Sequence, residues 1–213
     1  MKLRRSHSNH HVQGAGKTIL AGVVISEVLA LASVSTGIAF FYCQYKDSVT
    51  QQPINLLKTI AAQLARQNQD AYSILEAYHK ELQPTQGVST SPTSWMMREV
   101  VEKMAGCFGS VYVIVDGVDE CDENTTDVAE LLVGLADSVP SMSICVLSRD
   151  EPEIRRTLAE SFVHVGIEAQ NSDVHLFVAA ELDTRIRTKK LRLKNMSLKD
   201  EILHTLVQEH GGM

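Results

Sequence analysis

Gly14-Ala-Gly-Lys-Thr18, near the start of this chain of 213 residues, is the stretch that decides the predicted fold. Glycines in such a loop let backbone N–H groups turn inward around phosphate oxygens without a Cβ clash. A helix pattern starts at Gly16, and the positive end of that helix points at the bound anion. Lys17 is expected to reach the β- and γ-phosphates, and the Thr18 hydroxyl to bind magnesium. The stretch therefore indicates the C-terminal half of a phosphate-binding loop.

A second motif, Val111-Tyr-Val-Ile-Val-Asp116, is an apolar strand pattern that ends in a carboxylate. Ligand sites in parallel sheets gather at the carboxyl edge, so Asp116 is placed to hold magnesium directly or through water. A purely structural role is disfavoured, because an isolated acid that ends an all-apolar strand needs a partner. Gly117 leaves room beside it. Asp119 and Glu120 bring further carboxylates to the same edge, and one of them is expected to polarise an attacking water.

A third motif is the strand pattern Ser143 to Leu147, which runs into Ser148-Arg149. A basic residue at this edge can contact a γ-phosphate and report its presence, although Arg149 could instead pair with the neighbouring Asp150 or Glu151. The candidate nucleotide-binding residues are thus Gly14, Ala15, Gly16, Lys17, Thr18, Ile19 and Arg149, with Thr18 and Asp116 as magnesium ligands and Glu120 and Asp119 as catalytic candidates.

The order of the apolar patterns predicts an α/β fold with a parallel sheet flanked by helices. Strands are expected at 37–43, 111–115, 143–147 and 162–167, with helices between them. Residues Met1 to His11 are too polar to supply the strand that should run into the loop, so the sheet is expected to lack its first strand. His11 also stands where the full loop pattern places its first glycine.

Composition narrows the partners and the compartment. The net charge is −6, so the domain as a whole is not shaped to attract nucleic acid or an anionic membrane. The four cysteines are scattered without metal-ligand spacing, which favours a reducing compartment, and we expect a cytoplasmic protein. An alternative is a membrane anchor over Ile19 to Phe41, but Glu27 lies in the middle of that run, where a charge is costly.

Together, and in this order, the motifs resemble the NACHT and nephrocystin-like N-terminal domains of signal-transducing P-loop NTPases, the STAND class. The version common in fungal multidomain proteins is similar over nearly the whole chain, from about Val12 onward. The resemblance implies a P-loop NTPase fold and a nucleotide-operated switch that hydrolyses slowly. It also implies protein partners or self-assembly in a longer protein. The stretches that carry it are Gly14–Leu20, Ala39–Cys43, Val111–Cys121 and Val146–Pro152.

From these observations we expect a disordered or aberrant N-terminus at 1–13, a nucleotide-binding domain at 14–183, and a basic linker with a truncated C-terminal helix at 184–213. The expected function is Mg²⁺-dependent binding of a nucleoside triphosphate, ATP or GTP, with slow hydrolysis as an open possibility. Because of His11 and the missing strand, the alternative is a degenerate fragment that serves only as a protein-interaction module.

Overall fold

The structure is a computed structural model that describes residues 17–83, 91–166, 171–188, 190, 191, 195 and 197–208. The described residues fall into two units, the first ending at His164 and the second starting at Val165. In chain order the elements are α1 (Lys17–Ala30), β1 (Thr36–Tyr42), α2 (Pro53–Ala65), α3 (Gln69–Glu81), α4 (Ser94–Ala105), β2 (Ser110–Asp116), the 3-10 turns η1 (Val118–Glu120) and η2 (Asp122–Asn124), α5 (Thr125–Ser138), β3 (Met142–Leu147), α6 (Pro152–Leu158), α7 (Asn171–Arg187) and α8 (Ser197–Gln208).

The sheet of the first unit has three parallel strands among the described residues, in the order β1-β2-β3. Tyr42 lies opposite Asp116, and Asp116 lies opposite Leu147, so the three strands end together at one edge. The central strand β2 is apolar on both faces because helices cover both of them, which is typical of parallel sheets. The predicted α/β fold, a parallel sheet with flanking helices, is confirmed.

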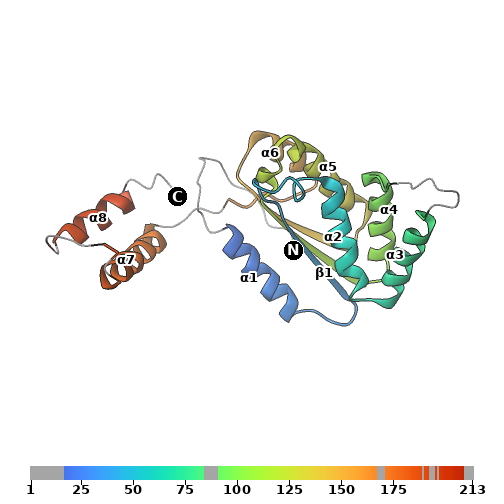
Figure 1. The fold of residues 1–213 in the computed structure, drawn as a ribbon, viewed down its shortest axis with the longest axis horizontal. Coiled ribbons are helices and arrows are strands. Elements are labelled where there is room, and N and C mark those ends of the chain that lie inside the picture. Colours follow the sequence, from blue (N-terminus) through green and yellow to red (C-terminus); the bar gives the residue numbers. More distant parts are fainter. Residues whose placement is uncertain are drawn as a thin grey trace. The chain divides into compact units, whose positions relative to one another are not determined.

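The core has two parts, one on each face of the sheet (Figure 1). On one face α2, α4 and α5 pack against β-strand side chains such as Ala39, Phe41 and Val113. On the other face α1 contributes Ala21 and Ile25, which pack against Ile114 and Leu147. Since α1 is anchored over the ends of β2 and β3, the packing of its apolar face brings its first residues to the carboxyl edge of the sheet.

Local sequence signals explain where the helices begin and how closely they pack. Pro53 is the first residue of α2, where its missing N–H costs nothing. The Asn68 side chain caps α3 by accepting from the Asp70 and Ala71 N–H groups at 2.8 and 3.1 Å. At Gly37 in β1 a Cβ would come within 2.9 Å of Leu64 Cδ2, so a larger residue here would require the Leu64 side chain to shift.

The strand expected at 162–167 is an error of the sequence analysis. Residues 162–166 form a bend and irregular backbone, and residue 167 lies outside the described residues. The apolar letters of this segment suit a strand, but a strand also needs a hydrogen-bonded neighbour. In the described part of the chain the sheet consists of β1, β2 and β3, so this segment has no strand paired with it.

Two further observations concern the remaining helices. In the second unit α7 contacts α8, and the Lys199 Nζ lies 2.6 Å from the Asp183 Oδ1, which ties the two helices together. Over the described residues, every helix falls short of the length and apolarity that crossing a bilayer requires, α1 with its 14 residues included.

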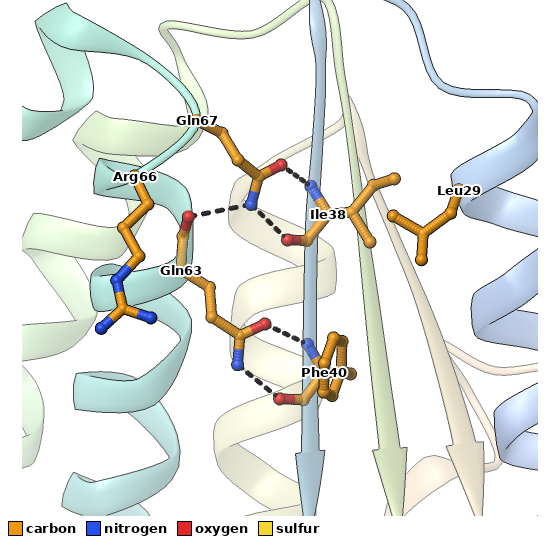
Figure 2. Close-up of a pocket in the computed structure, with 6 residues that line it drawn as sticks. All are labelled: Leu29, Ile38, Phe40, Gln63, Arg66 and Gln67. Carbon is orange, nitrogen blue, oxygen red and sulfur yellow. Dashed lines mark hydrogen bonds between the residues drawn. The ribbon is translucent and has the colours of Figure 1, made fainter.

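The outer edge of β1 is closed by Gln63 of α2 and by Gln67 in the turn that follows this helix (Figure 2). The Gln67 amide accepts from the Ile38 N–H at 2.9 Å and donates to the Ile38 carbonyl at 2.6 Å. Gln63 does the same at Phe40, with distances of 3.0 and 2.8 Å. The two amides match the two-residue repeat of the strand. They satisfy backbone groups that an exposed edge strand would offer to another chain.

This edge arrangement predicts the effect of replacing both glutamines with methionine, which keeps side-chain length and helix propensity. Gln63→Met/Gln67→Met should lower the free energy of unfolding by about 2–4 kcal/mol, because the four hydrogen bonds to β1, of roughly 1 kcal/mol each, are lost together with the one from the Gln67 amide to the Gln63 carbonyl. It should also promote self-association through the bared edge. Urea titration and size-exclusion chromatography measure the two effects. Gln69→Met is the matched control, and an equally large loss in that exposed residue would contradict the prediction.

Candidate functional site

The candidate site lies at the carboxyl edge of the sheet, where Asp116 ends β2. Its side chain is buried, with only 5% of the residue exposed. The main chain around it is held on both sides. The Cys43 N–H donates to the Asp116 carbonyl at 2.8 Å, and the Gly117 N–H donates to the Leu147 carbonyl at 2.8 Å. A carboxylate is therefore fixed in a position that the strand pairing itself determines.

The start of α1 supplies the partners of this carboxylate. Burial raises the pKa of Asp116 above its ordinary value, while a hydrogen bond from the Thr18 side chain and the positive charge of Lys17 oppose that rise. The negative charges of Asp119 and Glu120 raise the pKa further. Thr18, Lys17 and Asp116 are thus brought together as the sequence predicted, and burial is the dominant influence on the acid. Such a carboxylate is a good ligand for a cation that restores its lost solvation.

The turn after β2 depends on Gly117. Its φ of +80° is left-handed, and a Cβ at this position would lie 2.8 Å from the Cys43 carbonyl oxygen. Glycine therefore meets two requirements at once: an unusual backbone angle and a close approach to the end of β1. The chain then enters η1, which places Asp119 and Glu120 beside the end of β2. The expectation that Gly117 leaves room at the site agrees with this geometry.

Asp119 and Arg149 form a contact that joins the ends of β2 and β3. The Asp119 Oδ1 accepts from the Arg149 backbone N–H at 2.9 Å, and the Oδ2 lies 3.3 Å from the Arg149 Nε. The second contact is an ion pair without hydrogen-bond alignment, so the Oδ2 and the Nε each keep an unmade hydrogen bond. Arg149 is not paired with Asp150 or Glu151, because Asp150 forms its ion pair with Arg155 instead.

Glu120 differs from Asp119 in its surroundings. Its Oε2 accepts from the Tyr45 N–H at 3.1 Å, which links η1 to the loop that follows β1. The residue is only partly buried, so its carboxylate keeps access to solvent. The two acids that the sequence grouped as catalytic candidates therefore have different environments, one enclosed and ion-paired, the other open on one side.

The positions of the other predicted ligands add less evidence about the site. Gly14, Ala15 and Gly16 lie outside the described residues, as does His11. Ile19 is described, and its side chain is exposed on α1. Within the described ranges, no group of three or more His, Cys, Asp or Glu side chains could hold a metal ion by itself. A magnesium ion at Asp116 would thus need oxygen ligands from elsewhere, which phosphates and water supply.

The sequence analysis missed a pair of thiols beneath this site. Cys43, after β1, and Cys121, after η1, are both free and buried. A hydrogen bond between their side chains raises the pKa of the Cys43 thiol and lowers that of Cys121, so the two sulfur atoms are in contact. Their separation in the sequence gave no signal of this contact, since only the parallel pairing of β1 with β2 brings them together.

A hollow of about 340 Å³ lies away from these residues, at the edge strand β1. Leu29, Ile38 and Phe40 contribute its apolar wall, and the two edge glutamines with Arg66 contribute its polar rim (Figure 2). Asp116 and the other site residues do not line it. The hollow is therefore separate from the candidate site.

Together these features define an α/β domain with a buried carboxylate and the start of a helix at the carboxyl edge of a parallel sheet. The family model described as nephrocystin 3, N-terminal, matches residues 9–149, which include all of these features. The chain belongs to the nephrocystin 3 N-terminal family. None of the curated proteins matches the chain.

The turn geometry predicts that Gly117→Ala will destabilise the domain by about 1–3 kcal/mol, because a left-handed non-glycine residue is strained and the added Cβ meets a carbonyl. Gly22→Ala is the matched control: the position is helical and open, so alanine should be neutral or stabilise by up to about 1 kcal/mol. Urea unfolding followed by circular dichroism compares them. Equal stability of the two variants would show that Gly117 carries no strain.

The buried carboxylate predicts a pH-dependent gain in stability for Asp116→Asn when no nucleotide or metal is present. Because folding raises the pKa of Asp116, its carboxyl group favours the folded state at low pH. That advantage disappears as the pH rises from 3.8 through the raised value. At pH 7 the variant should therefore melt about 2–4 °C higher than the wild type, and the difference should vanish near pH 4.

Thermal melts across this pH range provide the measurement, with the exposed Asp137→Asn as control. A variant that melts lower than the wild type at pH 7 would mean that the contacts with Thr18 and Lys17 outweigh the cost of burial.

Proposed function

We propose that this chain binds a magnesium-bound nucleoside triphosphate, with ATP the first candidate, as the switch domain of a signalling NTPase of the NACHT or STAND type. The observation that carries the proposal is the grouping of Lys17, Thr18 and buried Asp116, which come from distant parts of the sequence. Lys17 contributes a positive charge, Thr18 contributes a hydroxyl, and Asp116 contributes a carboxylate that burial has deprived of solvation. This combination suits a metal–phosphate ligand better than it suits a structural contact.

Each residue then has a definite task. Lys17 attracts the β- and γ-phosphate oxygens, while the N-terminus of α1 directs its helix dipole toward the same anion. Thr18 and Asp116 are the residues that would hold the magnesium ion, either directly or through water. When bound, the ion neutralises charge that develops on the phosphates. Because Thr18 is exposed while Asp116 is buried, the pair reaches from the protein interior to the ligand.

Hydrolysis, where it occurs, needs a base and a means of sensing the terminal phosphate. Glu120 and Asp119 are the candidate bases, and Arg149 is the cation that would contact the γ-phosphate. Glu120 is partly exposed, so solvent can reach it, and incomplete exclusion of water is compatible with slow turnover. The four free cysteines fit a reducing, cytoplasmic setting, in which nucleotide state would control assembly with protein partners or with further copies.

The proposal predicts magnesium-dependent binding of a fluorescent ATP analogue that Lys17→Ala reduces by at least about tenfold, because a charge-assisted contact with phosphate contributes roughly 1.5–3 kcal/mol. Lys58→Ala is the matched control, since that lysine is exposed on α2. Fluorescence anisotropy with and without Mg²⁺ makes the measurement.

Three results of this experiment separate the candidates. Equal loss in both variants would mean nonspecific charge attraction. A folded wild-type chain that does not bind the analogue would favour the alternative, a protein-interaction module without nucleotide binding. Competition between unlabelled ATP and GTP then identifies the preferred base.

A further inference from the structure

The two acids that follow Gly117 differ in what their oxygens can still do. Asp119 is enclosed, with 1% of its side chain exposed, and both of its oxygens face Arg149. A general base must touch the water that it deprotonates. Asp119 cannot do so without first breaking its contacts with Arg149, and breaking them would leave a buried charge without its partner.

The Arg149 side chain, unlike that of Asp119, is partly exposed to solvent. Its Nε is buried against Asp119, yet 34% of the side chain is exposed, and the two Nη atoms are not among the described buried atoms that lack a partner. Among the described residues these Nη atoms have no hydrogen-bond partner. A guanidinium held at Nε with its Nη groups free presents the fork that matches phosphate oxygens.

Glu120, unlike Asp119, has a carboxylate oxygen that can still contact water. One of its oxygens accepts from the Tyr45 N–H, which fixes the direction of the side chain. The other oxygen has no hydrogen-bond partner among the described residues, and the residue is partly open to solvent. A fixed carboxylate with one free oxygen beside solvent is suited to orienting a water molecule.

We propose that Asp119 is a positioning residue for Arg149, that Arg149 reads the terminal phosphate, and that Glu120 alone activates water. This inference rests on the proposed function and divides the roles within that site. In the hydrolytic step Glu120 accepts a proton from water as the water oxygen bonds to the γ-phosphorus. The bond from that phosphorus to the bridging oxygen breaks, which leaves the nucleoside diphosphate and inorganic phosphate.

The consequence is that Asp119 and Arg149 act as one unit in recognising the γ-phosphate. Without the carboxylate, the guanidinium loses the anchor at Nε and is free to turn away from the edge of the sheet. Loss of either residue should therefore have the same effect on discrimination between triphosphate and diphosphate. Glu120 should be independent of both, because it contacts the loop after β1 and not β3.

The test compares Asp119→Asn, Arg149→Gln, their double variant and Glu120→Gln in the full chain. Asparagine keeps an oxygen for the Arg149 backbone N–H while it removes the charge. The readouts are the dissociation constants of Mg–ATP and Mg–ADP and the hydrolysis rate at saturating ATP.

Asp119→Asn and Arg149→Gln should each reduce the preference for ATP over ADP about tenfold, and the double variant no further. Glu120→Gln should keep the wild-type preference while hydrolysis falls by about a hundredfold or more.

Thermal melts without nucleotide cover the case in which Asp119→Asn folds poorly. The double variant should then melt higher than Asp119→Asn alone, since it no longer contains an unpaired guanidinium. Strictly additive losses in stability would overturn the inference, as would an unchanged ATP preference in Asp119→Asn. So would hydrolysis that survives in Glu120→Gln but disappears in Asp119→Asn. A wild-type chain that does not bind Mg–ATP overturns the proposed function itself, whereas the preceding results overturn only the division of roles.

Discussion

The burial of the Asp116 carboxylate is the constraint on which the rest of this site depends. β2 must be apolar to lie at the centre of a sheet covered on both faces, so its last residue is the first that can carry a charge. That charge still lies inside the protein, and burial raises its pKa. The start of α1 compensates with a hydroxyl and a positive charge. The start of α1 and the ionised Asp116 therefore favour one another, although without a ligand the cost of burial still exceeds what these contacts return.

The backbone after Asp116 converts this single fixed carboxylate into a site with several distinct groups. Gly117 turns the chain back under the end of β1, and η1 follows at once. One turn of 3-10 helix sends successive side chains in different directions, so Asp119 meets the end of β3 while Glu120 meets the loop after β1. Two adjacent acids thereby acquire unlike surroundings, and unlike surroundings are what allow similar groups to take different roles.

Much of this could be predicted from the sequence because the relevant signals are local. An apolar strand that ends in Asp116 and a glycine-rich stretch that ends in Lys17 and Thr18 each carry their meaning within a few residues. The pairing of Arg149 with Asp119 could not be predicted in this way, since Asp150 and Glu151 are nearer in sequence and only the alignment of β2 with β3 excludes them. The edge glutamines were equally hidden, because a glutamine on a helix is usually solvated. The prediction of a strand at 162–167 was wrong, because the apolar composition favours a strand while strand pairing is decided elsewhere in the chain.

Charge at the sheet edge gives a physical reason to expect magnesium dependence. Asp119 and Arg149 pair with one another, and among the described residues this leaves Asp116 and Glu120 beside the positive charge of Lys17. These two carboxylates repel a bare triphosphate at short range. A divalent cation between Asp116 and the phosphates reverses that repulsion, because it is attracted to both. Within the proposed function, the metal is thus a condition for binding, and the positions of Lys17 and Arg149 decide which phosphates the protein can distinguish.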